Sequence, residues 1–175
     1  FKKEKKIFND NFSNNIKKEL SYELTSDQTN ALNEINNDLK SEEKMFRLLQ
    51  GDVGSGKTIV ALISCLNVVK SGYQVAFMAP TEILAYQHYK LAQSLLKDKI
   101  KIGFLTSKTD YTERKKIIKD LEANKIKILF GTHSVFQEKI NYNKLGLVVI
   151  DEQHKFGVKQ RKKLSDKGGK NCDVL

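Results

Sequence analysis

Short apolar runs alternate with longer helical patterns along most of the chain. From residue 45 onward, several of the apolar runs are nearly continuous and bounded by turn residues, as is typical of strands buried on both faces of a sheet. The expected strands are Met45–Gln50, Gln74–Ala79, Lys101–Thr106, Ile126–Phe130 and Leu145–Ile150. Between them lie segments long enough for helices, namely Thr58–Lys70, Thr81–Lys97 and Thr112–Asn124.

This alternation of strands and helices predicts an α/β fold. A strand–helix–strand rhythm implies a mainly parallel sheet with right-handed crossovers and helices on both faces, which makes a three-layer domain. Ligands of such sheets bind beyond the carboxyl ends of the strands. Functional residues are therefore expected directly after each strand.

Residues 1–19 differ from the rest, because Lys and Asn alternate there with Phe8, Phe12 and Ile16. These three apolar residues are four positions apart and would share one face of a helix. We interpret residues 1–19 as a helical or linker segment that packs on a neighbouring part of the chain, and residues 20–175 as the main domain. The opening residues FKKE indicate a start inside a longer protein.

Composition narrows the class of protein. The 175 residues include 31 Lys and Arg against 21 Asp and Glu, a formal net charge of +10, and 39% are hydrophobic, which supports one core. Two cysteines and three histidines argue against a disulfide framework and a structural zinc site. No apolar stretch reaches the roughly 20 residues of a membrane span, so we expect a cytoplasmic protein with no membrane partner. The positive charge indicates a polyanionic partner without identifying it.

A phosphate-binding loop follows the first expected strand. Residues 51–58 read GDVGSGKT and match the pattern G-x-x-x-x-G-K-[ST]. Its glycines let successive N–H groups turn toward phosphate oxygens, and the following helix adds the positive end of its dipole. Lys57 would supply charge to the β- and γ-phosphates, and the Thr58 hydroxyl would ligate Mg²⁺. We predict that ATP is bound by Gly51, Asp52, Val53, Gly54, Ser55, Gly56, Lys57 and Thr58.

A pair of acidic residues, Asp151 and Glu152, directly follows the last expected strand. Adjacent carboxylates at this position would repel each other and be costly to desolvate without a cation, which the Mg²⁺ of a nucleotide would supply. Asp151 is then expected to hold the metal through water, and Glu152 to orient and deprotonate the attacking water. The alternative interpretation of Asp151 and Glu152 is an ordinary acidic first turn of a helix. A phosphate loop in the same sheet makes this alternative less favoured.

Together these motifs resemble the RecG family of superfamily 2 helicases, over about residues 20–170. The residues that carry the resemblance are Leu48–Thr58, Ala79–Ala85 with Gln87 and His88, Gly131–His133, Leu145 through Arg161 with the sequences DEQH and FGVKQR, and Leu24 and Thr25 with Gln28. Ser107 and Lys108 depart from the pattern, since the family has Gly then Ser there.

The resemblance implies the first RecA-like lobe of an ATP-dependent DNA helicase that acts on branched DNA, such as replication forks and Holliday junctions, in recombination and repair near the nucleoid. It implies that Gln28 reads adenine and that His154 links the γ-phosphate to the DNA side. The residues expected to contact DNA are Pro80, Thr81, Glu82, Thr132 and His133. The chain stops before motif III, the T-A-T motif that couples ATP hydrolysis to movement in this family. The resemblance also implies a second RecA-like lobe and an N-terminal wedge domain, which we expect as partners.

Several residues keep an ordinary structural alternative. Thr81 and Glu82 could cap the next helix, a role compatible with contact to the DNA backbone. His133 could be structural, and His88 lies mid-helix, where we interpret it as a packing or surface residue. The basic run at residues 114–116 is interpreted as a solvated helix face, and the run at 161–163 keeps both interpretations.

Two other functions remain possible for the whole protein. A transcription-repair coupling translocase has a similar motor, but its pattern usually carries Glu at the position of Gln153 and an aromatic residue at that of Ser55. A non-catalytic nucleotide-binding or interaction module is the other. The intact Lys57, Asp151 and Glu152 argue against it.

Overall fold

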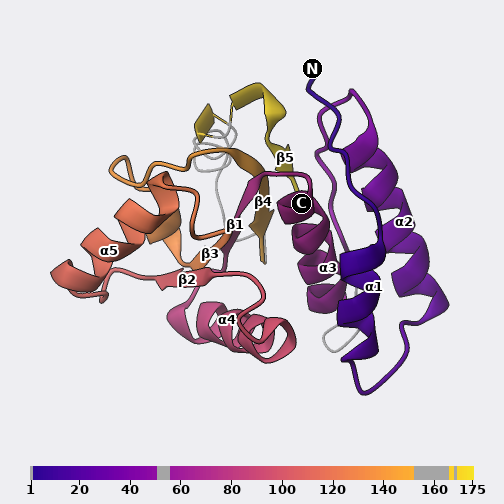
Figure 1. The fold of residues 1–175 in the computed structure, drawn as a ribbon, viewed down its shortest axis with the longest axis horizontal. Coiled ribbons are helices and arrows are strands. Elements are labelled where there is room, and N and C mark those ends of the chain that lie inside the picture. The colour runs from indigo at the N-terminus through magenta and orange to yellow at the C-terminus, as the bar shows by residue number, and fades with distance from the viewer. Residues whose placement is uncertain (1, 51–55, 152–165, 168) are drawn as a thin grey trace.

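The chain folds into a central parallel sheet with helices on both sides (Figure 1). The computed structural model describes residues 2–50, 56–151, 166–167 and 169–175. The helices are α1 (Asn11–Lys18), α2 (Ser26–Lys40), α3 (Lys57–Lys70), α4 (Glu82–Leu96) and α5 (Tyr111–Glu122), with the 3₁₀ turns η1 (His133–Phe136) and η3 (Gly169–Asn171). The strands are β1 (Gln74–Met78), β2 (Ile102–Leu105), β3 (Ile128–Gly131), β4 (Leu145–Ile150) and β5 (Asp173–Val174).

The sheet has the order β2-β3-β1-β4-β5, and every neighbouring pair is parallel. Strand β1 is central, with Phe77 opposite Phe130 of β3 and Val149 of β4. The predicted parallel sheet is thus confirmed, and β1 to β4 lie within about two residues of their expected bounds. The sequence did not reveal β5, because a strand of two residues leaves no readable periodicity.

The expected strand at Met45–Gln50 is wrong as a regular element. This segment forms only one parallel bridge, between Phe46 and Val174 of β5. The Val174 N–H donates to the Met45 carbonyl at 2.9 Å, and the Arg47 N–H donates to the Val174 carbonyl at 3.1 Å. Because β5 offers only two residues, the ladder cannot continue, and Phe46 and Leu48 are exposed rather than buried on both faces.

Alternate residues of β1 divide the core between the two faces of the sheet. Val75 and Phe77 belong to the hydrophobic cluster that includes α3 and the end of α4. Ala76 and Met78 belong to the cluster that includes α5 and η1. This period of two is the strand geometry that the buried runs predicted, and it gives the helix–sheet–helix layers.

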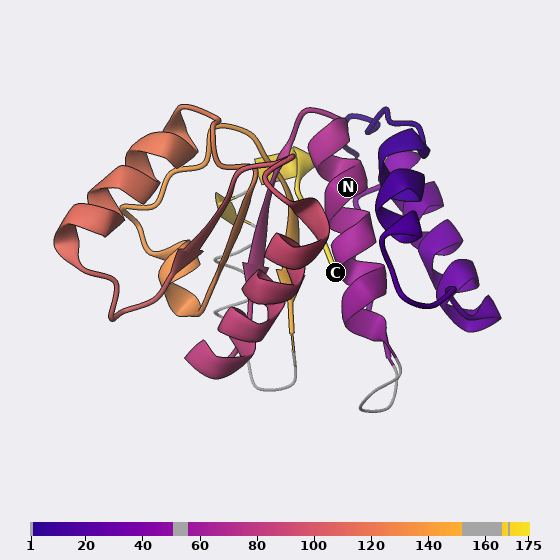
Figure 2. The same ribbon diagram turned by 60° about the horizontal axis from the view of Figure 1, so that its bottom comes forward.

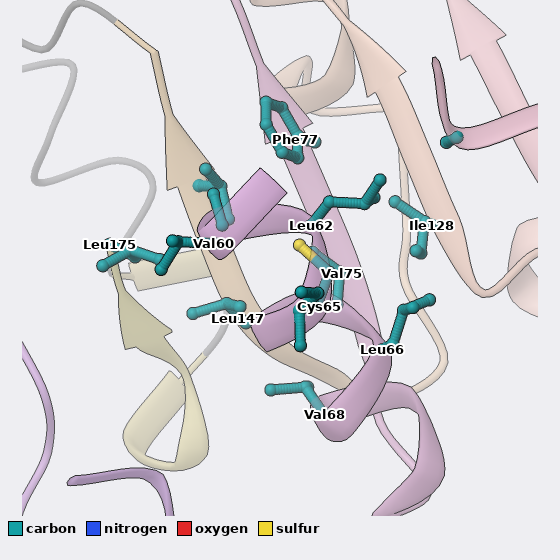
Figure 3. Packing of buried hydrophobic residues seen from close by; sticks show 14 of the residues in the cluster. Val60, Leu62, Cys65, Leu66, Val68, Val75, Phe77, Ile128, Leu147 and Leu175 are labelled. Carbon is teal, nitrogen blue, oxygen red and sulfur yellow. The ribbon is translucent and has the colours of Figure 1, made fainter. Parts of the chain in front are cut away.

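Helix α3 is covered on both sides, which explains why most of its residues are apolar on every side of the helix. Its residues Ile59 to Val68 are all buried. One side packs on the sheet, where Leu62, Cys65 and Leu66 lie against side chains of the strands such as Val75 (Figure 3). The other side contacts α1 and α2 (Figure 1). Within the described residues, no helix combines the length and the apolar character needed to cross a membrane.

Candidate active site

The carboxyl end of the sheet gathers most of the described residues that the sequence nominated. Asp151 directly follows β4, and its N–H donates to the carbonyl of Met78 at the end of β1, at 2.8 Å. Helix α3 leads into β1 through the short turn at residues 71–73, so its first residues lie at the same end (Figure 2). The segments 80–82 and 132–133 follow β1 and β3 at this end as well. Parallel strands therefore bring these four segments to one edge.

The start of α3 depends on a glycine. Gly56 is the N-cap residue and has a φ of 78°, in the left-handed region that favours glycine. A Cβ atom there would also collide with the Nε2 atom of Gln28. Lys57 and Thr58 occupy the first turn and are half-buried. The predicted nucleotide residues Gly51, Asp52, Val53, Gly54 and Ser55 lie outside the described residues, as do Glu152 and His154.

Gln28 connects α2 to the beginning of α3. Its N–H donates to Thr25 Oγ1 at 3.1 Å, and its Oε1 accepts from the Thr25 N–H at 2.8 Å, which is a capping box. Its Nε2 donates to the carbonyl of Gly56 at 3.4 Å. The T-x-x-Q spacing could have predicted the start of α2, a helix that was not among those expected. That Gln28 reads adenine stays a prediction.

An unexpected contact joins His88 of α4 to Asp151. His88 Nε2 lies 2.8 Å from Asp151 Oδ2, and the two side chains are only 11% and 22% exposed. The interpretation of His88 as a packing or surface residue is therefore wrong in part, because its ring packs 5.0 Å from that of Phe77 but its nitrogen binds the carboxylate. Period-two alternation would have placed Asp151 on the face of β4 that carries Val149, toward α3 and α4.

The oxygen atoms at this edge suit Mg²⁺. The Asp151 carboxylate and the Thr58 hydroxyl are hard oxygen donors, which Mg²⁺ prefers over nitrogen or sulfur. Proteins usually hold this cation through one or two side chains and let substrate phosphates and water complete the octahedron. With Lys57 in the same turn as Thr58, the donor set fits a Mg²⁺–nucleotide rather than a metal caged by protein alone.

Two loops at the same edge carry the predicted DNA contacts. Thr81 caps α4, with its Oγ1 accepting from the Leu84 N–H at 3.3 Å, so the structural alternative for Thr81 is confirmed. Glu82 forms a surface ion pair with Lys108 at 3.4 Å. Pro80 precedes this cap, half-buried.

The second loop begins after β3. Thr132 precedes η1 and His133 starts it, with His133 exposed. The Ala79 N–H donates to the Gly131 carbonyl at 2.9 Å, which joins the ends of β1 and β3 and holds the two loops next to each other. Contact of these residues with DNA stays a prediction.

Comparison with known proteins identifies the family. The DEAD/DEAH box helicase family matches residues 25–172. The ATP-dependent DNA helicase RecG of Aquifex aeolicus is 51% identical over 150 residues, which cover 85% of this chain and 19% of that helicase. The chain thus spans about a fifth of the length of the curated relatives it matches.

Solved structures of helicases are also similar to this chain. The structure of RecG bound to a three-way DNA junction is 39% identical, covers 99% of this chain with 23% of its own, and superposes with a TM-score of 0.88. The DEAD-box helicase Mss116 bound to ssRNA and UDP-BeF has a TM-score of 0.76 at 19% identity, covers 97% of this chain with 38% of its own, and supports the RecA-like fold alone. The chain therefore belongs to the DEAD/DEAH box helicase family, and it is similar to RecG helicases over most of its own length.

Proposed function

We propose that this chain is the ATP-binding first motor lobe of a RecG-like helicase, a DNA-dependent ATPase that acts on branched DNA in recombination and repair. The observation that carries the proposal is the convergence of Lys57, Thr58 and Asp151 at the carboxyl edge of a parallel sheet. A relative of 39% identity was solved on a three-way DNA junction, which supports branched DNA such as forks and Holliday junctions as the substrate.

Each residue has a separate task in the proposed hydrolysis. Lys57 would neutralise charge on the β- and γ-phosphates, while Thr58 would ligate Mg²⁺ through its hydroxyl and Asp151 would hold the metal through water. Glu152 orients the attacking water and takes its proton. Bound Mg²⁺ supplies the charge that stabilises the phosphoryl oxygens. Gln28 reads adenine and His154 connects the γ-phosphate to the DNA loops.

DNA is proposed to cross the two loops beside the nucleotide. Thr81 and Thr132 carry hydroxyls, and the first turn of α4 adds the positive end of a helix dipole, and both kinds of group commonly contact phosphate oxygens. Pro80, Glu82 and His133 line the same path. The net charge of +10 supports attraction to a polyanion, and its effect should weaken as salt rises.

The complete motor needs more than this chain, which matches about a fifth of its relatives. We propose a second RecA-like lobe that completes the ATP site and a wedge domain that engages the branch. Residues 1–19 would be the segment leading into the lobe of residues 20–175. We propose that the second lobe supplies an arginine finger, a residue that stabilises charge in the transition state and is typically worth about 10³–10⁵ in rate. This chain alone should therefore hydrolyse ATP very slowly. As a chromosomal DNA motor, the protein would act in the cytoplasm, at the nucleoid.

Substitution of Glu152 by Gln in the complete protein tests the function. Loss of a general base should lower DNA-dependent ATPase activity about 10²–10⁴-fold and leave ATP binding intact. Glu122→Gln, at an exposed position of α5, is the matched control and should behave as wild type. Unchanged ATPase activity in Glu152→Gln would contradict the proposal and favour a non-catalytic nucleotide-binding module.

Substitution of Lys57 by Ala tests the phosphate loop separately. Because Lys57 contacts the phosphates in the ground state, ATP affinity itself should fall, as measured by fluorescence titration with a labelled nucleotide. If Lys57→Ala and wild type bind ATP with equal affinity, the assignment of residues 51–58 as a phosphate loop is wrong.

A further inference from the structure

Helix α4 holds His88 against the sheet. Ala85 and Ala92, one turn to either side of His88, are 1% and 0% exposed, so this stripe of the helix faces the core. The His88 ring lies 5.0 Å from the ring of Phe77 in β1, tilted by 42°. Phe77 is opposite Val149 in β4, two residues before Asp151. The imidazole of His88 therefore lies between the backbone of α4 and strands β1 and β4, and β4 ends directly before Asp151.

The contact between His88 and Asp151 has a defined direction. An ionised carboxylate can only accept hydrogen bonds, so Nε2 of His88 carries the hydrogen and donates it to Oδ2 at 2.8 Å. Both side chains are largely shielded from water. A hydrogen bond in such a shielded environment is stronger than one at the surface. A donor held by packing on Phe77 therefore restricts how the carboxylate of Asp151 can rotate.

We propose that His88 is a positioning residue that orients the Asp151 carboxylate for the Mg²⁺ of the bound nucleotide. It acts through Asp151 and not by touching the nucleotide. The inference rests on the proposed function, since Asp151 meets Mg²⁺ only when a Mg²⁺–nucleotide binds. Partners that orient a metal-ligating group are typically worth 10–100-fold in metal affinity or activity.

The test separates Mg²⁺-dependent from Mg²⁺-independent binding in the complete protein. A fluorescent ATP analogue is titrated in the presence of Mg²⁺ and again in EDTA. For His88→Ala, affinity in Mg²⁺ should fall about 10-fold, whereas affinity in EDTA should equal that of wild type. His88→Gln keeps an N–H donor and should recover part of the Mg²⁺-dependent affinity.

Gln93→Ala is the matched control on the same helix. It removes an exposed hydrogen bond from Gln93 Nε2 to the Tyr89 hydroxyl, of 2.9 Å, and should bind nucleotide as wild type does in both conditions. Should His88→Ala fail to fold, His88→Phe gives the same comparison, because it keeps a ring against Phe77 and has no donor.

Two outcomes overturn the inference alone. Equal Mg²⁺-dependent affinity in the His88 variant and wild type would show that Asp151 needs no such partner. An equal loss in Mg²⁺ and in EDTA would show that His88 only supports packing. If wild type binds the nucleotide in neither condition, the proposed function itself fails, and the inference falls with it.

Discussion

Replacing Asp173 by Asn should destabilise the chain strongly, because Asp173 anchors a buried charge network. Its Oδ2 accepts from Lys3 Nζ at 2.7 Å and from Lys6 Nζ at 2.6 Å, and its Oδ1 accepts from the Met45 N–H at 2.7 Å. All three charged side chains are 0% exposed. The network joins the N-terminal segment, the Met45 segment and β5, three parts of the chain that are far apart in sequence.

The magnitude follows from the two ammonium groups that the variant would leave without a counter-charge. Removing one partner of a buried ion pair typically costs about 3–5 kcal/mol. For each lysine the cost has a ceiling, since a buried lysine can release its proton, which at pH 7 costs about 5 kcal/mol from an ordinary pKa near 10.4. Burial already lowers the pKa of Lys6 against the opposing effect of Asp173. We expect Asp173→Asn to lower the free energy of unfolding by about 3–5 kcal/mol, a large part of the 5–15 kcal/mol of a typical domain.

Urea unfolding followed by circular dichroism measures this loss. The loss should shrink between pH 7 and pH 9, because a lysine without its partner releases its proton more easily as pH rises. The triple variant Lys3→Met/Lys6→Met/Asp173→Asn removes every charge of this network and keeps an acceptor for the Met45 N–H, so it should regain most of the stability.

Lys5→Met is the matched control, since the Lys5–Glu42 pair spans 3.6 Å with both side chains more than half exposed. Its effect should stay below about 1 kcal/mol. A loss below about 1 kcal/mol in Asp173→Asn, or a triple variant no more stable than the single one, would refute the reasoning.

Two further predictions concern α3 and the turn after it. Gly56→Ala should cost more stability than Gly72→Ala in urea unfolding: both have positive φ, which costs about 1–2 kcal/mol, but only at Gly56 would the new Cβ collide with Gln28. Equal losses of stability in the two variants would show that the Gln28 side chain moves away from the new Cβ at no cost. Burial raises the pKa of the Cys65 thiol, so the folded chain keeps this proton while the unfolded thiol ionises above about pH 9. Stability should therefore fall with rising pH, by about 1.4 kcal/mol more in wild type than in Cys65→Ala between pH 8 and pH 10, and parallel pH profiles would contradict the assignment.

Local patterns predicted most of the fold. Buried runs such as Leu145–Ile150 are strands within the expected bounds, because a parallel sheet covered on both faces demands continuous apolar residues. The pattern failed at Met45–Gln50, where an apolar run meets a partner strand of only two residues. It also missed α2, whose capping box at Thr25 and Gln28 was interpreted only as a nucleotide motif.

Motifs nominated separate residues of the candidate site but not the contacts between them. The sequence nominated Lys57, Thr58 and Asp151 from motifs, and parallel topology brings them to one edge. The contact of His88 with Asp151 was not predicted, because the two residues are 63 positions apart and belong to different elements. Gln28 was nominated for adenine, yet its contact with Gly56 depends on how α2 packs on α3.

The sequence by itself determined the phosphate-loop pattern, the acidic pair after a strand and the alternation of strands and helices, since these depend on neighbouring residues and short periodicities. Tertiary structure alone decided that Lys3 and Lys6 share the carboxylate of Asp173 and that His88 binds Asp151. Contacts between residues far apart in sequence leave no local pattern, because their energy arises only when packing removes water and brings the charges together.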